Sequence, residues 1–161
     1  MNSMKHIFWG IALLLTQTIT AQKWSTPRIE SYGKIHFDKN LSFQPDINKT
    51  YKLVFNIDND AEKEGVNMRL WKIARELNLL KAAGVPDQNI EIAAVVHGKA
   101  IAISLTDKAY KKRYHKKNPN TDLVKALNNA GVKLYLCEQT LAGMNFEESE
   151  LNPSWEVTLS A

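Results

Sequence analysis

The one cysteine of the chain, Cys137, is the residue best suited to chemistry. It stands between an apolar run, Val132–Leu136, and a short helix-like run that begins at Glu138. Backbone N–H groups at the start of a helix have no partner inside it, and they favour a thiolate over a thiol. The thiolate is the nucleophilic form of cysteine, so this position suggests a reactive sulfur. The negative charge of Glu138 acts in the opposite direction.

A single cysteine leaves three interpretations open. It is a buried, inert thiol, a partner in an intermolecular disulfide, or a free reactive group. The third interpretation gains support from His97, which follows the apolar run Ile90–Val96, because a Cys–His pair is a recurrent way of activating sulfur. A histidine at the end of a strand also commonly caps a turn, since its ring nitrogens bond readily to nearby backbone.

Polar residues also close the first apolar run, Tyr51–Ile57, where Asn56 and Asp58 stand. Ligands in open α/β sheets gather outside the carboxyl ends of the strands. We therefore expect Asn56, Asp58, His97 and Cys137 to lie along one edge of a sheet.

Several kinds of site are not expected. A metal needs three or four converging ligands, and the chain has no such spacing. The first strand is followed by the acidic run Asp58–Asp60 rather than by a Gly-rich phosphate loop, so no nucleotide or flavin cofactor is predicted. The formal charge of +4 is too mild for a nucleic-acid-binding surface, so no nucleic-acid partner is predicted.

The elements that must position these residues alternate between strands and helices. Ile90–Val96 is almost continuously apolar, which is typical of a parallel strand covered on both faces. The pattern predicts an α/β fold, a three-layer α/β/α sandwich with a mainly parallel sheet of four to five strands. Strands are predicted at 51–57, 90–96, 132–136 and 155–159, helices at about 66–80, 106–114, 121–130 and 138–143, and a turn with a short helical piece at 99–105.

Two boundaries of these helices have local signals. Asp60 or a neighbour is expected to cap the first helix, which ends before Gly84. Thr106 is expected to cap the second helix.

The N-terminus resembles a secretory signal. Lys5 supplies a positive charge, Ile7–Leu15 is unbroken and apolar, and Thr16–Ala21 is small or polar. The apolar run is far shorter than the roughly 20 residues that cross a bilayer, so no stable membrane insertion is expected after cleavage. We predict cleavage after Ala21 and a periplasmic or secreted protein. Residues 22–50 then form an irregular N-terminal arm, and 51–161 form the α/β domain.

One stretch, residues 108–117, is strongly basic. A solvated helix face explains such a run, and an acidic partner or an anionic lipid surface is the alternative. Its charged or titratable members are Lys108, Lys111, Lys112, Arg113, His115, Lys116 and Lys117.

Four motifs, in their order and spacing, resemble the DsrE/DsrF-like family over about Tyr51 to Ala161. They are Tyr51–Ile57, Val95-Val96-His97-Gly98, Asn118-Pro119-Asn120 and Gly131-Val132 leading to Cys137-Glu138-Gln139-Thr140-Leu141. The resemblance implies an α/β/α sandwich that assembles into homotrimers or homohexamers. It also implies a cysteine that carries a persulfide between sulfur donor and acceptor proteins, and Cys137 is the residue that matches it.

Two functions follow as hypotheses. In the first, an exported sulfur carrier or sulfurtransferase-like protein uses Cys137 and His97 as catalytic residues. Asn56, Asp58, Gly98 and Gln139 then line the ligand site. In the second, the domain is a non-catalytic binding or assembly module in which Cys137 only packs. The sequence leaves open whether the protein is an enzyme.

Overall fold

The computed structural model describes residues 23–161, and the predicted signal segment, residues 1–21, lies outside them. Its central sheet has four strands, all parallel, in the order β1-β4-β5-β6. The predicted α/β class with a parallel sheet is therefore confirmed. The strands are β1 (Tyr51–Ile57), β4 (Ile90–Val96), β5 (Lys133–Cys137) and β6 (Glu156–Thr158).

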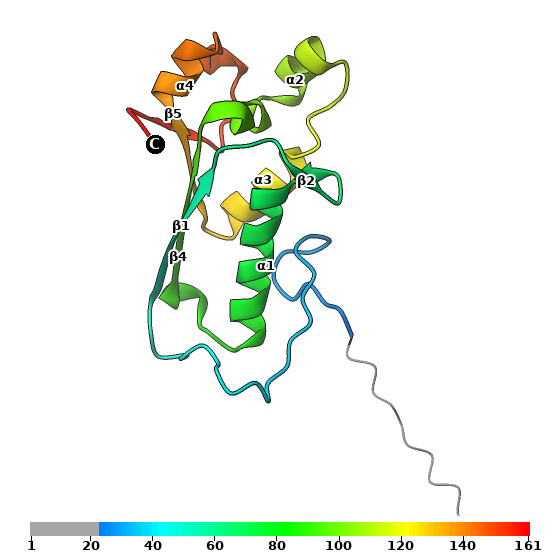
Figure 1. Ribbon diagram of the computed structural model, residues 1–161, viewed down its shortest axis with the longest axis vertical. Coiled ribbons are helices and arrows are strands. Elements are labelled where there is room, and N and C mark those ends of the chain that lie inside the picture. The colour runs from blue at the N-terminus through cyan, green and yellow to red at the C-terminus, as the bar shows by residue number, and fades with distance from the viewer. Residues whose placement is uncertain (1–22) are drawn as a thin grey trace, which may run out of the picture.

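The helices lie on one face of this sheet and beyond the carboxyl ends of its strands (Figure 1). The α-helices are α1 (Met68–Ala82), α2 (Asp107–Tyr114), α3 (Thr121–Asn129) and α4 (Glu138–Gly143). Short 3-10 segments are η1 (Asp87–Asn89), η2 (Gly98–Ser104) and η3 (Glu148–Glu150). The segment predicted as a turn and short helical piece is thus η2, and Thr106 caps α2 by accepting the N–H of Ala109. None of the helices within residues 23–161 is long and apolar enough to span a membrane.

The start of α1 differs from the prediction. A small antiparallel hairpin, β2 (Glu62–Lys63) with β3 (Val66–Asn67), occupies the residues before it. Its two turn residues, Glu64 and Gly65, both have positive φ (52° and 81°), as a tight hairpin turn requires. Asn67, and not Asp60, caps the helix, because its side-chain oxygen accepts the N–H groups of Arg69 and Leu70.

Helix α1, between β1 and β4 in the chain, and helix α3, between β4 and β5, cover the same face of the sheet (Figure 1). The sheet adds its strands in chain order from one edge to the other. Right-handed crossovers that all advance in one direction place their helices on one side. The core lies between this face and the two helices. The strands contribute Leu53, Phe55, Ile57, Ile92, Ala94, Val96, Leu134 and Leu136, and the helices contribute Leu70, Ile73, Leu77, Leu123 and Leu127.

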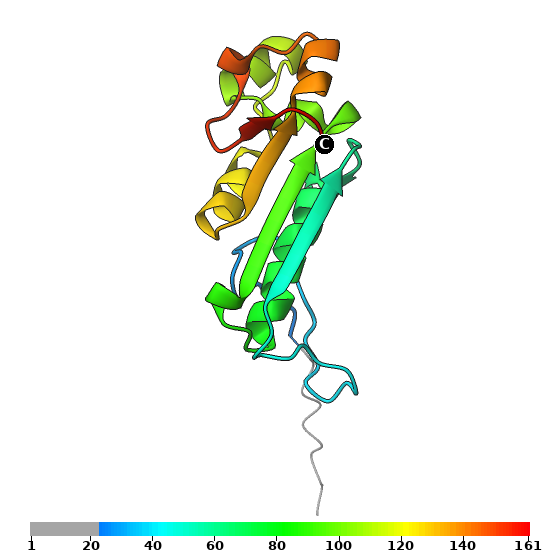
Figure 2. The same cartoon turned by 90° about the vertical axis from the view of Figure 1, so that its left-hand side faces the viewer.

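The opposite face of β1 and β4 is open (Figure 2). On β1 it presents Lys52, Val54 and Asn56, all exposed, with Val54 at 76%. The second helical layer of the predicted sandwich is not formed over β1 and β4 by the described residues. Helices α2 and α4 stand instead beyond the carboxyl ends of the strands (Figure 1).

The N-terminal arm is anchored to α1 by one fully buried side chain, Asn78. Its amide oxygen accepts the N–H groups of Arg28 and Ile29, both at 2.8 Å. Its amide nitrogen donates to the carbonyls of Tyr32, at 2.9 Å, and Gly33, at 3.0 Å. The arm therefore lies on the side of α1 that faces away from the sheet (Figure 1).

The arm also approaches α1 at backbone distance. A Cβ atom at Gly33 would lie 2.2 Å from the nitrogen of Arg75, and Gly33 has a φ of +63°. Only glycine fits this contact.

Candidate functional site

The candidate site lies at the carboxyl ends of three neighbouring strands. Strand β1 ends at Ile57, β4 at Val96 and β5 at Cys137. Ile57 is paired with Val96, and Val96 with Leu136, so the three ends lie side by side. The parallel register thus places the polar residues that follow β1 and β4 on the same edge as the cysteine.

Cys137 is the last residue of β5 and the residue before α4. It is only 5% exposed. The hydroxyl of Thr140 lowers the pKa of the Cys137 thiol by hydrogen bonding to the thiolate, and this outweighs burial, which raises the pKa. The N–H groups of Thr140, Ala161 and Gln139 lower the pKa further. Hydrogen-bond donors around the sulfur are what a nucleophilic thiolate needs.

The orientation of the Thr140 hydroxyl follows from its other partner. The N–H of Gly98 donates to Thr140 Oγ1 over 3.4 Å. A hydroxyl has one proton and two acceptor lone pairs, so accepting from Gly98 leaves its proton free for the sulfur. Thr140 therefore connects the turn after β4 with Cys137.

Local donors, and not a long helix, act on this sulfur. Helix α4 has only six residues, and Cys137 makes no regular side-chain capping bond to it. The N–H groups of Gln139, Thr140 and Ala161 therefore stabilise a thiolate as individual hydrogen-bond donors rather than through a helix dipole. The carboxylate of Glu138, which lies beside the cysteine in sequence, accepts the side-chain amide of Gln139 at 2.5 Å.

The end of β6 and the residues after it complete the surroundings of the sulfur. Thr158 is paired with Cys137 in the sheet, and its hydroxyl lies 3.2 Å from the carbonyl oxygens of both Leu136 and Ser160, either of which can accept its single proton. The chain then brings the N–H of Ala161 to the thiol. Ser160 and Ala161 are themselves exposed, so the layer over Cys137 is thin.

His97 pairs with Asn56, and not with Cys137. Its Nε2 lies 2.7 Å from Asn56 Oδ1, a contact that joins the ends of β4 and β1. The amide oxygen can only accept, so Nε2 is the donor in this contact. No hydrogen bond within residues 23–161 links His97 to the sulfur.

The remaining predicted site residues take different places. Gly98, at a φ of +55°, packs against the carbonyl oxygen of Asp58, which would lie 3.0 Å from an added Cβ. The Asp58 side chain is exposed and accepts the amide of Asn59. Gln139 acts on the sulfur through its backbone N–H, while its side chain is exposed.

Sequence reasoning missed Thr140 and the segment 158–161 as parts of the site. A threonine three residues after the residue that precedes a helix occupies the position whose side chain reaches back to the helix start. That spacing was a usable signal for Thr140. No local signal marks residues 158–161, because their contact with Cys137 depends on the pairing of β6 with β5.

The motif Asn118-Pro119-Asn120 holds in place the segment η2, which follows His97. The buried Asn118 amide donates to the carbonyls of Ile103, at 2.9 Å, and Leu105, at 2.8 Å. Its oxygen accepts the backbone N–H of Asn120. These bonds fix the end of η2, the segment that begins at Gly98.

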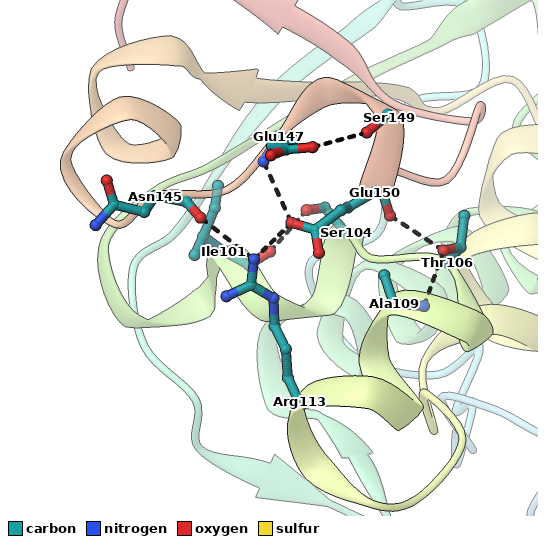
Figure 3. A network of polar contacts seen from close by, with 9 residues as sticks. All are labelled: Ile101, Ser104, Thr106, Ala109, Arg113, Asn145, Glu147, Ser149 and Glu150. Carbon is teal, nitrogen blue, oxygen red and sulfur yellow. Dashed lines mark hydrogen bonds and ion pairs between the residues drawn. The ribbon is translucent and has the colours of Figure 1, made fainter.

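A second network ties α2 to the segment after α4 (Figure 3). The guanidinium of Arg113 donates to the carboxylate of Glu150 and to the carbonyl of Asn145, and it lies 4.4 Å from the Phe146 ring. This pairing lowers the pKa of Glu150 and raises that of Arg113. Thr106 adds two bonds to the carbonyl of Glu150. One residue of the basic stretch thus has a structural role.

Within residues 23–161 no three histidine, cysteine, aspartate or glutamate side chains are grouped so as to hold a metal ion.

A family model described as the DsrE/DsrF-like family matches residues 52–161. The chain belongs to the DsrE/DsrF-like family. This DsrE/DsrF-like segment contains the whole parallel sheet except Tyr51, together with Cys137 and the residues around it. Membership in this family places the chain among proteins of sulfur-relay type.

The other comparisons add less. A solved structure, a protein of unknown function named MTH1491 from Methanobacterium thermoautotrophicum, is similar with a TM-score of 0.43 and 20% identity. The match covers 68% of this chain and 83% of that chain. No curated protein matches the chain.

Proposed function

We propose that the protein is a sulfur carrier that holds sulfane sulfur on Cys137 as a persulfide. The observation that carries this proposal is the donor-lined surroundings of the thiol, in which Thr140 lowers the pKa of Cys137. Membership in a family of sulfur-relay type supports it. The proposal gives Cys137 the role of nucleophile and Thr140 that of its hydrogen-bond donor.

The transfer is a thiolate exchange without net oxidation. The Cys137 thiolate attacks the terminal sulfur of a persulfide donor, RSSH. A new S–S bond forms to Cys137, the old S–S bond breaks, and RS⁻ leaves with the bonding electron pair. Attack by an acceptor thiolate on the terminal sulfur reverses the sequence and restores the Cys137 thiolate.

His97 has a supporting role in this proposal. Asn56 holds the ring through Nε2, and the proposal assigns proton exchange at the same strand edge to Nδ1. Cys137 is only 5% exposed, so a path for sulfur has to open. In this proposal the exposed residues Ser160 and Ala161 move aside to open it.

A non-catalytic binding or assembly module remains the second candidate, because the same burial suits a cysteine that only packs. The two candidates differ in one measurable property. A carrier accepts sulfur in its native state, and a packing thiol does not.

Incubating residues 22–161 with glutathione persulfide is expected to add one sulfur atom to the native protein. Intact-mass spectrometry with peptide mapping should place that atom on Cys137. Cys137→Ser is the control and should stay unmodified. Loading of Cys137 only after denaturation contradicts the carrier function and favours the packing role.

We further propose that the protein forms a homotrimer or homohexamer through the open face of its sheet. Val54 is 76% exposed there, next to an ion pair of 3.4 Å between Lys52 and Glu91. A parallel sheet is usually covered on both faces, and the described residues leave this face uncovered, so a second subunit is suited to cover it.

Val54→Asp is expected to reduce the assembly to monomers, because it places a charge in an interface that must lose its water. Size-exclusion chromatography with light scattering measures the mass. Leu41→Asp, on the arm and 62% exposed, is the matched control and should leave the mass unchanged. A parent protein that is already monomeric would refute the proposed assembly.

Export completes the proposal, based on the pattern of residues 1–21. Protein recovered from outside the cytoplasm should begin at Gln22 by N-terminal sequencing. Recovery of the chain with Met1 from the cytoplasm would contradict export.

A further inference from the structure

A second site lies away from Cys137, where the arm, the β2–β3 hairpin and α1 meet. It is a groove of about 670 Å³, which we call the two-tryptophan groove. A smaller hollow of about 290 Å³ shares four of its residues and extends it along α1 toward Arg75 and Leu79. The groove is lined by Trp24, Ser25, Thr26, Glu30, Ser31, Lys34, Lys63, Glu64 and Trp71.

Trp24 forms one wall of this groove. Trp24 is 64% exposed, although an indole is among the side chains that gain most from burial. The backbone behind it is fixed, because Ser25 and Ile35 exchange two hydrogen bonds of 3.0 and 2.9 Å. An exposed ring on a held backbone offers a flat platform that needs little ordering when a ligand stacks on it.

Trp71 forms the floor, and polar groups hold it in place. It is 3% exposed, and its indole N–H donates to Glu64 Oε2 at 3.1 Å. The ammonium of Lys63 lies 4.2 Å from the ring centre. The guanidinium carbon of Arg75 also lies over this ring, 5.5 Å from its centre, so Trp24 is the indole that stays open to a ligand, with the carboxylate of Glu64 and the ammonium of Lys63 at its side of the groove.

The polar rim selects the chemistry of the ligand. In the groove itself two lysines, Lys34 and Lys63, are balanced by two glutamates, Glu30 and Glu64, and three hydroxyl side chains lie among them, while Arg75 belongs to the adjoining hollow. A balanced rim disfavours phosphates and other strong anions, because carboxylates repel them. It suits a ligand whose groups both donate and accept hydrogen bonds.

We propose that the two-tryptophan groove binds a neutral carbohydrate chain. One face of a pyranose ring carries C–H groups that match the negative face of an indole, and its hydroxyls donate to Glu30 and Glu64 and accept from the lysines. The sugar stacks on Trp24 and hydrogen-bonds to the rim. The site shares no residue with the Cys137 site, so the proposal is independent of sulfur transfer.

Titration of residues 22–161 with cellotetraose, maltotetraose and chitotetraose tests this proposal. We expect a saturable change of tryptophan fluorescence with at least one of them. Trp24→Ala should weaken that binding at least tenfold by calorimetry. Phe43→Ala is the matched control, since Phe43 is on the arm, is 91% exposed and does not line the groove.

Two results would overturn the proposal. One is the absence of saturable binding of all three oligosaccharides to the parent protein. The other is equal affinity of the parent and Trp24→Ala, which would place any bound sugar elsewhere. Because Trp24 is largely exposed, its replacement leaves the fold intact, which circular dichroism checks.

Discussion

Thr140→Val is expected to raise the pKa of the Cys137 thiol and to slow its alkylation at neutral pH. Valine keeps the shape of threonine and removes the hydroxyl whose hydrogen bond is the largest cause of the lowered pKa. Hydrogen bonds to charged groups contribute about 1.5–3 kcal/mol, so the thiolate reaction should slow by about tenfold or more.

The sign of the pH dependence follows from the direction of the shift. A lowered pKa means that the thiolate persists to a lower pH than in a free cysteine. We therefore expect the parent profile of alkylation rate against pH to have its midpoint below the ordinary pKa of a thiol, and Thr140→Val to move it upward. Iodoacetamide labelling followed by mass spectrometry across pH measures both profiles.

Thr140→Ser provides the matched control, since it retains the hydroxyl and loses only a methyl group. It should keep the parent midpoint. If Thr140→Val and Thr140→Ser give the same midpoint as the parent, Thr140 does not stabilise the thiolate, and the donor role assigned to it is wrong. Lowered sulfur loading in Thr140→Val with an unchanged midpoint would indicate a steric role instead.

Asn78→Ala is expected to destabilise the protein by about 3 kcal/mol and to release the arm from α1. The change removes the amide oxygen that accepts from two backbone N–H groups and the amide nitrogen that donates to two backbone carbonyls. Each buried backbone group left without a hydrogen bond costs about 1–3 kcal/mol. Detachment of the arm lets water satisfy these groups, which keeps the total below the sum. Urea denaturation gives the free energy of unfolding.

Limited proteolysis distinguishes release of the arm from general loss of stability. In Asn78→Ala, cleavage should begin within residues 23–50 while the α/β domain stays intact. Asn128→Ala, at an exposed position of α3, is the control and should change the free energy of unfolding by no more than about 0.5 kcal/mol. An arm as resistant in Asn78→Ala as in the parent contradicts the anchoring role.

The sequence predicted the sheet well because its strands are short, apolar and bounded by turn signals. Strands β1 and β4 have the predicted bounds, and β5 is displaced by one residue. The start of α1 was harder to predict. Val66 fits the apolar stripe of the helix but belongs to β3, because the turn at Glu64 and Gly65 pairs it back with Lys63.

Of the two buried faces of α1, the sequence predicted only the one that packs on the sheet. Leu70, Ile73 and Leu77 face the sheet, and that stripe was recognised. Trp71, Ala74 and Asn78 recur at helical spacing beside it and are buried as well. A polar Asn78 within this second stripe gave no indication that four arm backbone groups would satisfy it.

The candidate site divides in the same way. Chain order was enough to place His97 and Cys137 at one end of the sheet. It was not enough to pair His97 with Asn56 or to bring the N–H of Ala161 to the sulfur, since these contacts depend on register and on the path of the chain after β6. The open face of the sheet was not predicted, because the apolar run of β4 does not reveal the order of the strands. That order decides whether the connecting helices cover one face of the sheet or both.

The pairing of β6 with β5 has a consequence for local opening. It covers only three positions, yet it holds Thr158 beside Cys137 and leads to the N–H of Ala161 at the thiol. A pairing this short is expected to open while β1, β4 and β5 stay paired, so the surroundings of the sulfur should open at a lower free energy than the core.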